Sequence, residues 1–551
     1  MADIEINFGA NIIENITTGM YEDSRVVFRE FIQNSCDSID RAVSEGIMDK
    51  SDACVDIRII PEDRKIEIYD NARGIPCADF QRILADVANS EKTAINDKGF
   101  RGIGRLAALA YCQELVFSST FKGEDTISIM RCDAKTMRRL LDEHATGKER
   151  YTALEILQSI YNFSTKIDAR QTNSHYFKVE MIGINNESNK LLDIDDIQEY
   201  LSFVAPVPYS TKFSMYASTI YRHGKDVECP VNDYKIRLNG ERLLKPYGTR
   251  FSVYKGGEDQ IYNIEFNDFR TESGELIAWA WIGISTFKGT ILKDSAMRGI
   301  RIRKENIQIG TESLLDGYMP ENKGSFYFVG EMHIASKELI PNSQRNFFNE
   351  NNMRLELEKK LRSYCNELNA IRYKGSKINS LVKKIDEYEA LTFEFKKKQD
   401  EQGFATPSVK EAMEKKIADK KKEWIIATNE LDNIIVTEST SFVDRAASDA
   451  ARRRKEDIKE AKKKREAERK KLVTKDASNK NGTKKNNEGT QSTVKKKKKD
   501  YYITSHMSAL NRDNKKIVRI IIDITMALVE SGSMSQASAD ALFDKMKEKF
   551  K

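Results

Sequence analysis

The chain has 551 residues, of which 40% are hydrophobic and 9% aromatic, so it is too long for one ordinary domain and can bury sizeable cores. Charged residues reach 32%, and the longest apolar run, residues 517–529, is interrupted by Arg519 and Asp523, which excludes an integral membrane protein. Acidic residues near the N-terminus argue against an export signal, and seven scattered cysteines without a CxxC pair fit a reducing cytoplasm.

Pattern changes along the chain predict five parts. Residues 1–209 mix helical and strand periodicities, and residues 210–352 are richer in strand-like alternation. Residues 353–450 consist almost entirely of helix formers, with one proline break. Residues 451–500 hold about 21 basic and 8 acidic residues, roughly +13 of charge in a chain of net charge +6, and predict a basic helix followed by a disordered lysine-rich linker. Residues 501–551 predict a small helical module.

The first chemical motif lies on a predicted helix over residues 24–43. Apolar residues line one side of this helix, while Glu30, Asn34 and Asp37 recur one turn apart on another. An amide oxygen is a hard ligand for Mg²⁺, and a carboxylate can orient and deprotonate a water molecule. Taken alone, the same spacing is more often the solvated face of an amphipathic helix.

The second motif follows a predicted β-hairpin over residues 55–70, in which apolar residues alternate on both strands around the turn PEDR. The second strand ends at Asp70, and its carboxylate could accept a hydrogen bond from an exocyclic amine such as that of adenine. Gly74 would let the backbone pass close to the base. By itself, the segment also fits an ordinary Asp-Asn turn.

The third motif is the glycine pattern Gly99, Gly102 and Gly104 immediately before an apolar, helix-forming stretch. Such a loop lets backbone N–H groups approach phosphate oxygens at the positive end of a helix. It lacks the GK[ST] ending of a P-loop, and it neither opens a Rossmann unit nor precedes a ribose-binding acid. Alone it is a weak signal.

In this order and spacing, the three motifs resemble the ATP-binding domain of the superfamily of gyrase, heat-shock protein 90, histidine kinases and mismatch-repair ATPases (GHKL). The residues around Glu30 are most similar to the heat-shock and mismatch-repair branches. The resemblance implies that Glu30 is the general base, Asn34 the Mg²⁺ ligand and Asp70 the residue that reads adenine. The other implied contacts with ATP are Asp37, Gly74, Gly99, Arg101, Gly102, Ile103 and Gly104.

The resemblance covers residues 1–352 and implies an N-terminal α/β sandwich of the Bergerat type over residues 1–209 and an α/β middle domain over residues 210–352. Together with the helix-forming composition of the C-terminal region, this predicts an α+β fold. A polar stretch at about residues 76–98 would form a lid over the nucleotide. Two positions depart from the family pattern. Ala72 replaces a usual glycine, and Ser174-His175 stands where a Gly-Thr pair is expected, which puts a hydroxyl contact near adenine in doubt.

Residues 341–346 (PNSQRN) follow two predicted strands and resemble a loop of the heat-shock protein 90 middle domain. There, an arginine reaches back to the nucleotide from the second domain. Carried over, Arg345 would contact the γ-phosphate and stabilise charge that develops during phosphoryl transfer. A plain helix-capping loop is the alternative.

The sequence therefore predicts a slow Mg-dependent ATPase that closes as a clamp, with a homodimer as the expected assembly. Its output is open between three classes: a chaperone-like machine acting on protein clients, a clamp that engages nucleic acid through residues 451–500 as mismatch-repair and microrchidia ATPases do, and an ATP-gated switch that recruits a partner protein.

Overall fold

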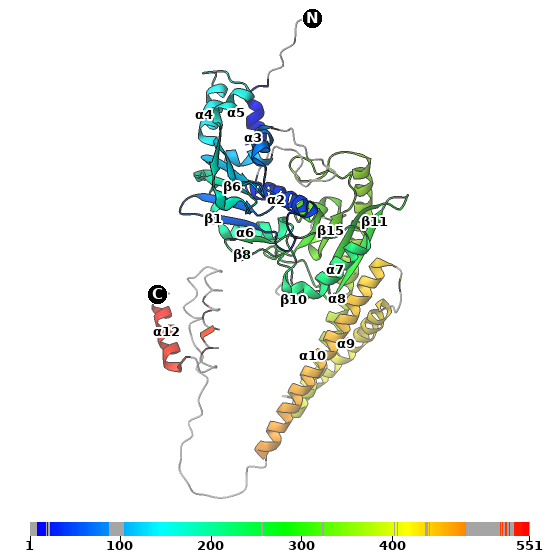
Figure 1. The fold of residues 1–551 in the computed structure, drawn as a ribbon. Coiled ribbons are helices and arrows are strands. Elements are labelled where there is room, and N and C mark those ends of the chain that lie inside the picture. The colour runs from blue at the N-terminus through cyan, green and yellow to red at the C-terminus, as the bar shows by residue number, and fades with distance from the viewer. Residues whose placement is uncertain are drawn as a thin grey trace. The chain divides into compact units, whose positions relative to one another are not determined.

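The computed structural model describes residues 8–17, 19, 23–87, 104–254, 257–321, 324–401, 403–404, 406–435, 439 and 441–480, with single positions from 518 and a helix at the C-terminal end (Figure 1). The chain divides into two compact units, residues 1–474 and 475–551. The boundaries predicted at residues 209, 352 and 450 all fall inside the first unit and stay predictions. The α+β fold class is confirmed.

An eight-stranded sheet forms the N-terminal part of the first unit, in the order β5-β4-β3-β6-β2-β1-β7-β8. Neighbouring strands are antiparallel except β1 and β7. The strands are Val55–Ile60 (β1), Lys65–Asp70 (β2), Glu114–Thr120 (β3), Thr126–Asp133 (β4), Tyr161–Ile167 (β5), Tyr176–Ile182 (β6), Ile236–Leu238 (β7) and Glu241–Arg242 (β8). The predicted hairpin is thus present as β1 and β2, with residues 61–64 as its turn.

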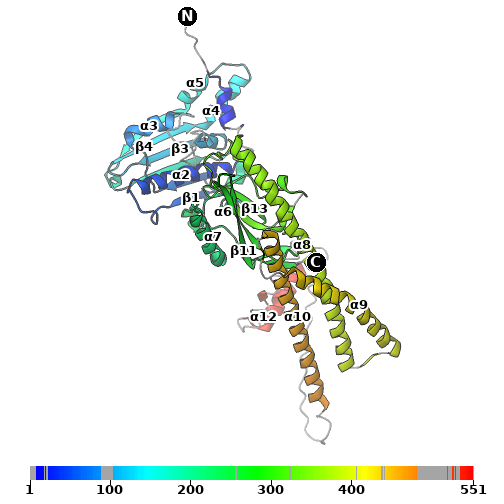
Figure 2. The ribbon, with the colours of Figure 1, turned by 90° about the vertical axis from the view of Figure 1, so that its right-hand side faces the viewer.

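Helices cover one face of this sheet, as Figure 2 shows. The cause is the alternation in the strands: every second residue of β1 and β2 is buried in one apolar core. The other face carries paired charges, such as Lys65 with Glu67 and Glu180. The helical elements are Asn11–Thr17 (α1), Val26–Ser44 (α2), Cys77–Ala85 (α3), the 3₁₀ helix Gly104–Ala110 (η1), Ala134–Ala145 (α4), Ala153–Ile160 (α5) and Ile194–Val204 (α6).

A second sheet follows, with five strands in the order β11-β12-β15-β13-β14. The strands are Asn263–Arg270 (β11), Leu276–Ile284 (β12), Gly299–Lys304 (β13), Ile307–Ile309 (β14) and Val329–Ile334 (β15), with β13 and β15 parallel. A separate pair, Arg250–Val253 (β9) and Gly257–Gln260 (β10), and the helix Ser214–Asp226 (α7) complete this part. The strand-rich character predicted for residues 210–352 is confirmed.

Both faces of the second sheet are buried, so β12, β13 and β15 contain almost no exposed residue. One face packs against the helix Asn352–Glu401 (α8) through an apolar core. The other face carries Trp279 and Trp281, which pack with α7 and with the chain that leads from the first sheet. Because both faces are covered, the arginines of β13, Arg301 and Arg303, are buried as well.

Three long helices end the first unit: α8, Pro407–Ile434 (α9) and Phe442–Lys480 (α10) (Figure 1). The predicted proline break is the start of α9, where Thr406 caps the helix and Pro407 occupies its first turn. The basic helix α10 pairs with carboxylates of its neighbours, as in Lys462–Glu389 and Arg465–Asp386. Part of the positive charge of residues 451–500 is therefore neutralised within the chain.

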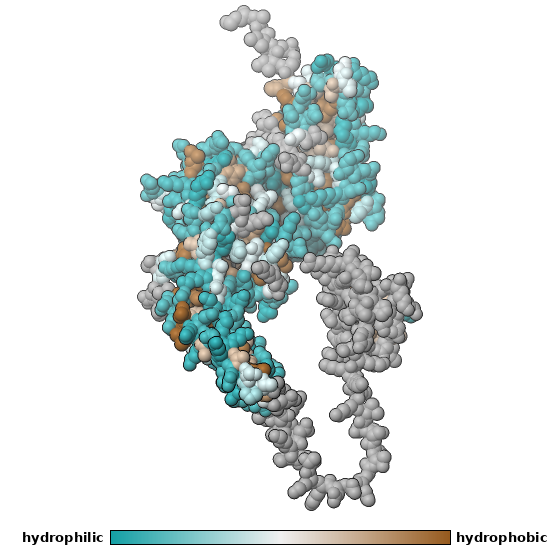
Figure 3. Space-filling model, turned by 180° about the vertical axis from the view of Figure 1, so that it is seen from behind, coloured by the Kyte–Doolittle hydropathy of each residue, from teal (hydrophilic) through white to brown (hydrophobic). Residues whose placement is uncertain are grey.

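The visible face of the molecule in Figure 3 is mostly hydrophilic, with small separate apolar patches. None of the helices within the described ranges combines the length and apolar character needed to cross a bilayer. In the second unit, the helix Gln536–Lys549 (α12) buries Ala539 and Phe543. A helix was predicted in this C-terminal module.

Candidate active site

Helix α2 carries the first motif and is buried on nearly every side. It contacts β2 on one side and η1 and α6 on others. Glu30 is 7% exposed and Asp37 only 3% exposed. Reading these residues as the solvated face of an amphipathic helix is therefore wrong. Carboxylates are rarely buried without a partner, so their burial indicates that the helix belongs to a functional site or to an interface between packed elements.

Asp70 is the last residue of β2 and is 2% exposed. Its Oδ2 accepts a hydrogen bond of 2.7 Å from the hydroxyl of Ser35, the residue that follows Asn34 on α2. Its Oδ1 accepts one of 3.2 Å from the backbone N–H of Ala72. The carboxylate is thus held in one orientation by the helix and by its own turn.

Asn34, Asp70 and Gly74 line one cavity of about 170 Å³. Three aromatic rings and several aliphatic side chains supply its apolar walls, and arginines lie at its margins. Its other lining residues are Phe31, Ser38, Arg41, Arg73, Ile75, Ile83, Leu84, Arg105, Phe117 and Phe177. An apolar slot with one oriented carboxylate is suited to a flat heterocycle that carries an amine.

The turn after Asp70 has a fixed shape. Gly74 has a φ of +70°, and a Cβ there would collide with the carbonyl oxygen of Thr120 on β3. The hydroxyl of Ser119 accepts a hydrogen bond from the N–H of Ile75 and donates one to the carbonyl of Tyr176. The glycine is therefore required by packing against the sheet, a reason that the sequence did not indicate.

The carboxylate of Glu30 lies against Gly104, where a Cβ would collide with Oε2. The last glycine of the glycine-rich motif thus lies against the predicted base. The helix that follows is the 3₁₀ helix η1. Four predicted contacts, Gly99, Arg101, Gly102 and Ile103, lie outside the described residues, as do residues 88–98 of the predicted lid. Asp37 is described but does not line the cavity.

Arg345 lies in the loop before α8 and contacts the N-terminal part of the unit. Its Nε is 3.3 Å from Oε1 of Glu30. The neighbouring carbonyl of Gln344 accepts a hydrogen bond of 3.5 Å from Arg29. The helix-capping alternative does not hold for this loop, because it is Asn351 that accepts the N–H of Arg354 at the start of α8.

Around Arg345, a second cavity of about 510 Å³ opens between α2, α6, β13 and the loop of residues 344–346. Arginines and acids alternate in its walls. Arg25 is paired with Asp23 and Asp196 at 2.7 and 3.0 Å. The charges largely cancel, so this cleft shows no preference for an anion. It marks the boundary across which the two sheets approach each other.

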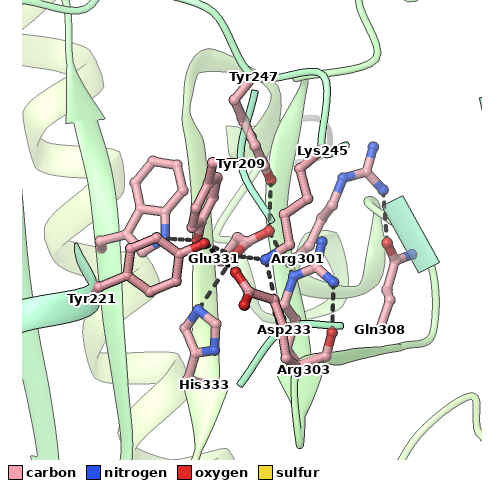
Figure 4. Close-up of polar contacts among 12 residues, drawn as sticks. Tyr209, Tyr221, Asp233, Lys245, Tyr247, Arg301, Arg303, Gln308, Glu331 and His333 are labelled. Atoms are coloured by element: carbon pink, nitrogen blue, oxygen red, sulfur yellow. Dashed lines mark hydrogen bonds and ion pairs between the residues drawn. The ribbon is translucent and has the colours of Figure 1, made fainter. Parts of the chain in front are cut away.

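A buried polar cluster ties the second sheet to the segment that leads into it (Figure 4). Glu331 on β15 is fully buried, and its carboxylate forms ion pairs with Nε of Arg303 at 2.6 Å and Nζ of Lys245 at 3.0 Å. The hydroxyls of Tyr209 and Tyr247 also donate to its carboxylate. Two cations and two hydroxyls thus satisfy one carboxylate.

Burial and the nearby Arg303 together lower the pKa of Lys245 to about 7, against the opposing effect of Glu331. Burial likewise lowers the pKa of His333 to about 4. Although burial opposes ionisation of Glu331, Arg303 and Lys245 hold its pKa well below the usual range. A lysine of this kind can act as a base, yet Lys245 is fully buried and lines neither cavity, so its role is structural.

Sequence reasoning missed three residues of the site. Ser35 was available as a polar neighbour of Asn34, one helical position from the motif. Arg29 precedes Glu30, and its Nε lies 3.6 Å from Oε1 of the Glu30 carboxylate. His175 was noted as a departure, but its ring contacts the carbonyl of Ala72, the other departure, at 2.6 Å. Only the fold brings these two together.

Residues 21–164 match a family model described as histidine kinase-, DNA gyrase B- and HSP90-like ATPase. No curated protein matches the chain. The matched residues contain α2, Asp70, Gly74 and Gly104, which the fold gathers around Glu30 and the first cavity. Over residues 21–164, the chain is therefore similar to ATPases of the histidine kinase, DNA gyrase B and HSP90 type.

Proposed function

We propose that the chain is a Mg-dependent ATPase that works as a conformational clamp of the heat-shock protein 90 type. One observation carries the proposal: Asp70 and Asn34 line a single cavity, while Glu30 of the same helix is touched by Arg345 from the loop that follows the second sheet. A purine site and a hydrolytic group are thereby linked to a second domain.

In this proposal, the adenine amine donates to Asp70, and the base lies among Phe31, Phe117 and Phe177. Residues 99–104 bind the phosphates, and Asp37, one turn along α2 from Asn34, contributes to nucleotide binding. The amide oxygen of Asn34 suits a hard cation, and its place in the cavity wall fits a metal ligand. Mg²⁺ held there would neutralise phosphate charge.

Hydrolysis begins with a water molecule that hydrogen-bonds to Glu30. Its oxygen forms a bond to the γ-phosphorus, its proton passes to the Glu30 carboxylate, and the bond from the γ-phosphorus to the β,γ-bridging oxygen breaks to leave ADP. Arg345 opposes the charge that develops on the γ-phosphoryl oxygens. Burial of Glu30 excludes competing water from the carboxylate.

Calorimetry and a phosphate-release assay test this proposal together. The wild-type protein should bind ATP and hydrolyse it slowly. Glu30→Ala should keep ATP affinity within about threefold and lower turnover by at least about 10²-fold. Glu114→Ala, which removes a surface carboxylate paired with Arg131, is the matched control and should leave both quantities unchanged. Absence of ATP binding by the wild type contradicts the proposal.

As the output of the clamp we propose chaperone-like action on protein clients by a homodimer that closes on ATP. The support is the Arg345 contact, because such a loop couples nucleotide binding to domain position. Unfolded polypeptide should then stimulate hydrolysis, and a non-hydrolysable analogue should increase the solution mass or compactness. An unchanged hydrolysis rate together with ATP-dependent capture of a folded partner would favour the recruiting switch instead.

A second candidate output, binding of nucleic acid through residues 451–500, is favoured by the outer side of α10. Lys463 and Lys464 are exposed, and within the described part of the chain neither is in an ion pair. Their neighbours Lys462 and Arg465 form ion pairs with Glu389 and Asp386 of α8. Exposed lysines without acidic partners can release counterions from a phosphate backbone.

DNA titrations distinguish the two outputs. If nucleic acid is the ligand, DNA stimulates the ATPase, the effect falls steeply with salt, and Lys463→Ala combined with Lys464→Ala weakens it. Lys415→Ala combined with Lys416→Ala removes the same charge from exposed positions on α9 and should not. No DNA effect at low salt excludes this output and leaves the client-directed output and the recruiting switch.

A further inference from the structure

His175, which immediately precedes β6, contacts the turn that follows Asp70. Its Nδ1 lies 2.6 Å from the carbonyl oxygen of Ala72, across 103 residues of sequence. Ala72 has no exposed surface. A buried carbonyl needs a hydrogen-bond partner, and here the imidazole provides it.

The contact fixes the tautomer of the ring. A carbonyl oxygen can only accept, so Nδ1 of His175 must carry the hydrogen atom. Nε2 plays no part in this bond. An asparagine side chain can place its amide nitrogen close to the position of Nδ1, whereas a glutamine places it close to that of Nε2. The two amides therefore separate the role of Nδ1 from that of the rest of the ring.

Ala72 connects His175 to the predicted adenine carboxylate. The N–H of Ala72 donates to Oδ1 of Asp70, while the carbonyl of the same residue accepts from His175. Ser35 holds the other oxygen, Oδ2, from helix α2. Ser35 on helix α2 and the N–H of Ala72 thus both orient the Asp70 carboxylate. Ala72 is in turn held by His175, which directly precedes β6.

The rest of the turn is held at its two ends. Asn71 accepts from the N–H of Cys54 and donates to the carbonyl of Asp52, and Ile75 donates to Ser119. Between these ends, the carbonyl of Ala72 accepts a hydrogen bond from His175. Removing the imidazole takes away the hydrogen bond to the carbonyl of Ala72, while the ends of the turn stay attached.

We propose that His175 is a positioning residue for base recognition: through Ala72 it sets the Asp70 carboxylate that accepts the exocyclic amine of adenine. This inference rests on the proposed ATP site and deepens it. It gives the two departures from the family pattern, Ala72 and His175, a shared role as partners of one hydrogen bond. His175 does not line the cavity, so it acts on the base only through Asp70.

The test compares the affinities of variants for ATP and for ITP, whose base carries a carbonyl in place of the amine. A site built to bond an amine rejects the analogue that lacks it. His175→Phe should weaken ATP binding by about tenfold and leave ITP binding unchanged, so that the ATP/ITP preference falls by the same factor. A role confined to folding would lower both affinities together.

Conservative variants keep the test decisive if His175→Phe folds poorly. His175→Asn should retain most of the ATP/ITP preference, and His175→Gln should lose it; Ser174→Ala is the neighbouring control. An unchanged preference in His175→Phe, or equal preferences in the Asn and Gln variants, overturns the inference. If the wild type binds no ATP, the proposed function itself fails, which is a different result.

Discussion

Arg345 Nε lies 3.3 Å from Glu30 Oε1, and the two residues come from different parts of the first unit. Arg345 has a φ of +55°, a left-handed conformation that arginine rarely adopts. Both residues are less than a tenth exposed. Strained backbone that persists next to a buried carboxylate is typical of functional loops. The contact ties the loop before α8 to the predicted base.

Arg345→Ala is expected to slow ATP hydrolysis by about 10²-fold or more, because a fixed cation near the γ-phosphate is lost. ATP affinity should change by no more than about threefold, since base recognition lies elsewhere. Single-turnover kinetics beside calorimetry measure the two effects separately. Gln344→Ala is the control, because its side chain bonds Asn346 in the same loop. Normal turnover in Arg345→Ala would remove this loop from the mechanism.

Gly74→Ala should destabilise the protein by at least about 3 kcal/mol, because a left-handed residue gains a side chain that also collides with Thr120. Gly46 is a matched control: it has the same φ of +70°, but nothing lies within 4 Å of its Cβ position. Gly46→Ala should therefore cost only about 1 to 2 kcal/mol. Urea unfolding of both variants gives the comparison, and equal losses would refute the collision.

Glu331→Gln should cost about 3–5 kcal/mol of stability, because Lys245 and Arg303 are left buried without a full counter-charge. Glu387→Gln breaks a pair with Lys420 whose side chains are 42% and 29% exposed, and it should cost about 1 kcal/mol or less. Chemical denaturation compares the two. Similar losses would mean that the cluster contributes no more than a surface ion pair.

The sequence predicted local features of the site well and long-range ones poorly. The hairpin, Asp70 at the end of its strand, and the long helix with Glu30 and Asn34 all follow from residue spacing. In β13, Arg301 and Arg303 alternate with isoleucines, a pattern that is typical of a half-exposed strand. The chain around Tyr209 and Lys245 covers that face, so both sides are buried. No local pattern encodes a cover that distant residues supply.

The same limit applies to basic residues and to Arg345. The charge of residues 451–500 suggested a free cationic surface, but α8 supplies carboxylates to one side of α10. Periodicity located the helix and could not show its partner. The Arg345 loop was found by resemblance alone, and its contact with Glu30 joins residues that lie far apart in the sequence.

Stability should fall as the pH is lowered from about 6.5 towards 5, because of His333. Burial lowers its pKa from 6.5 to about 4, and Lys245 and Arg303 act in the same direction, while Glu331 at 3.3 Å opposes them. Between pH 4 and 6.5, His333 is therefore neutral in the native state and protonated in the unfolded chain. The stabilisation is complete above pH 6.5 and is lost as the pH falls towards 4, with a slope of at most about 1.4 kcal/mol per pH unit.

His333→Phe keeps a flat ring to stack on Trp279, which lies at a centroid distance of 4.4 Å, but cannot take up a proton. Its free energy of unfolding, measured in urea between pH 5 and 6.5, should therefore depend less on pH than that of the wild type. Glu331 adds little in this window, because its pKa is lowered and its own loss of stability begins near 4.5 and below. Parallel pH profiles for the two proteins would show that His333 takes up its proton in the folded state, and that burial in the cluster does not prevent it.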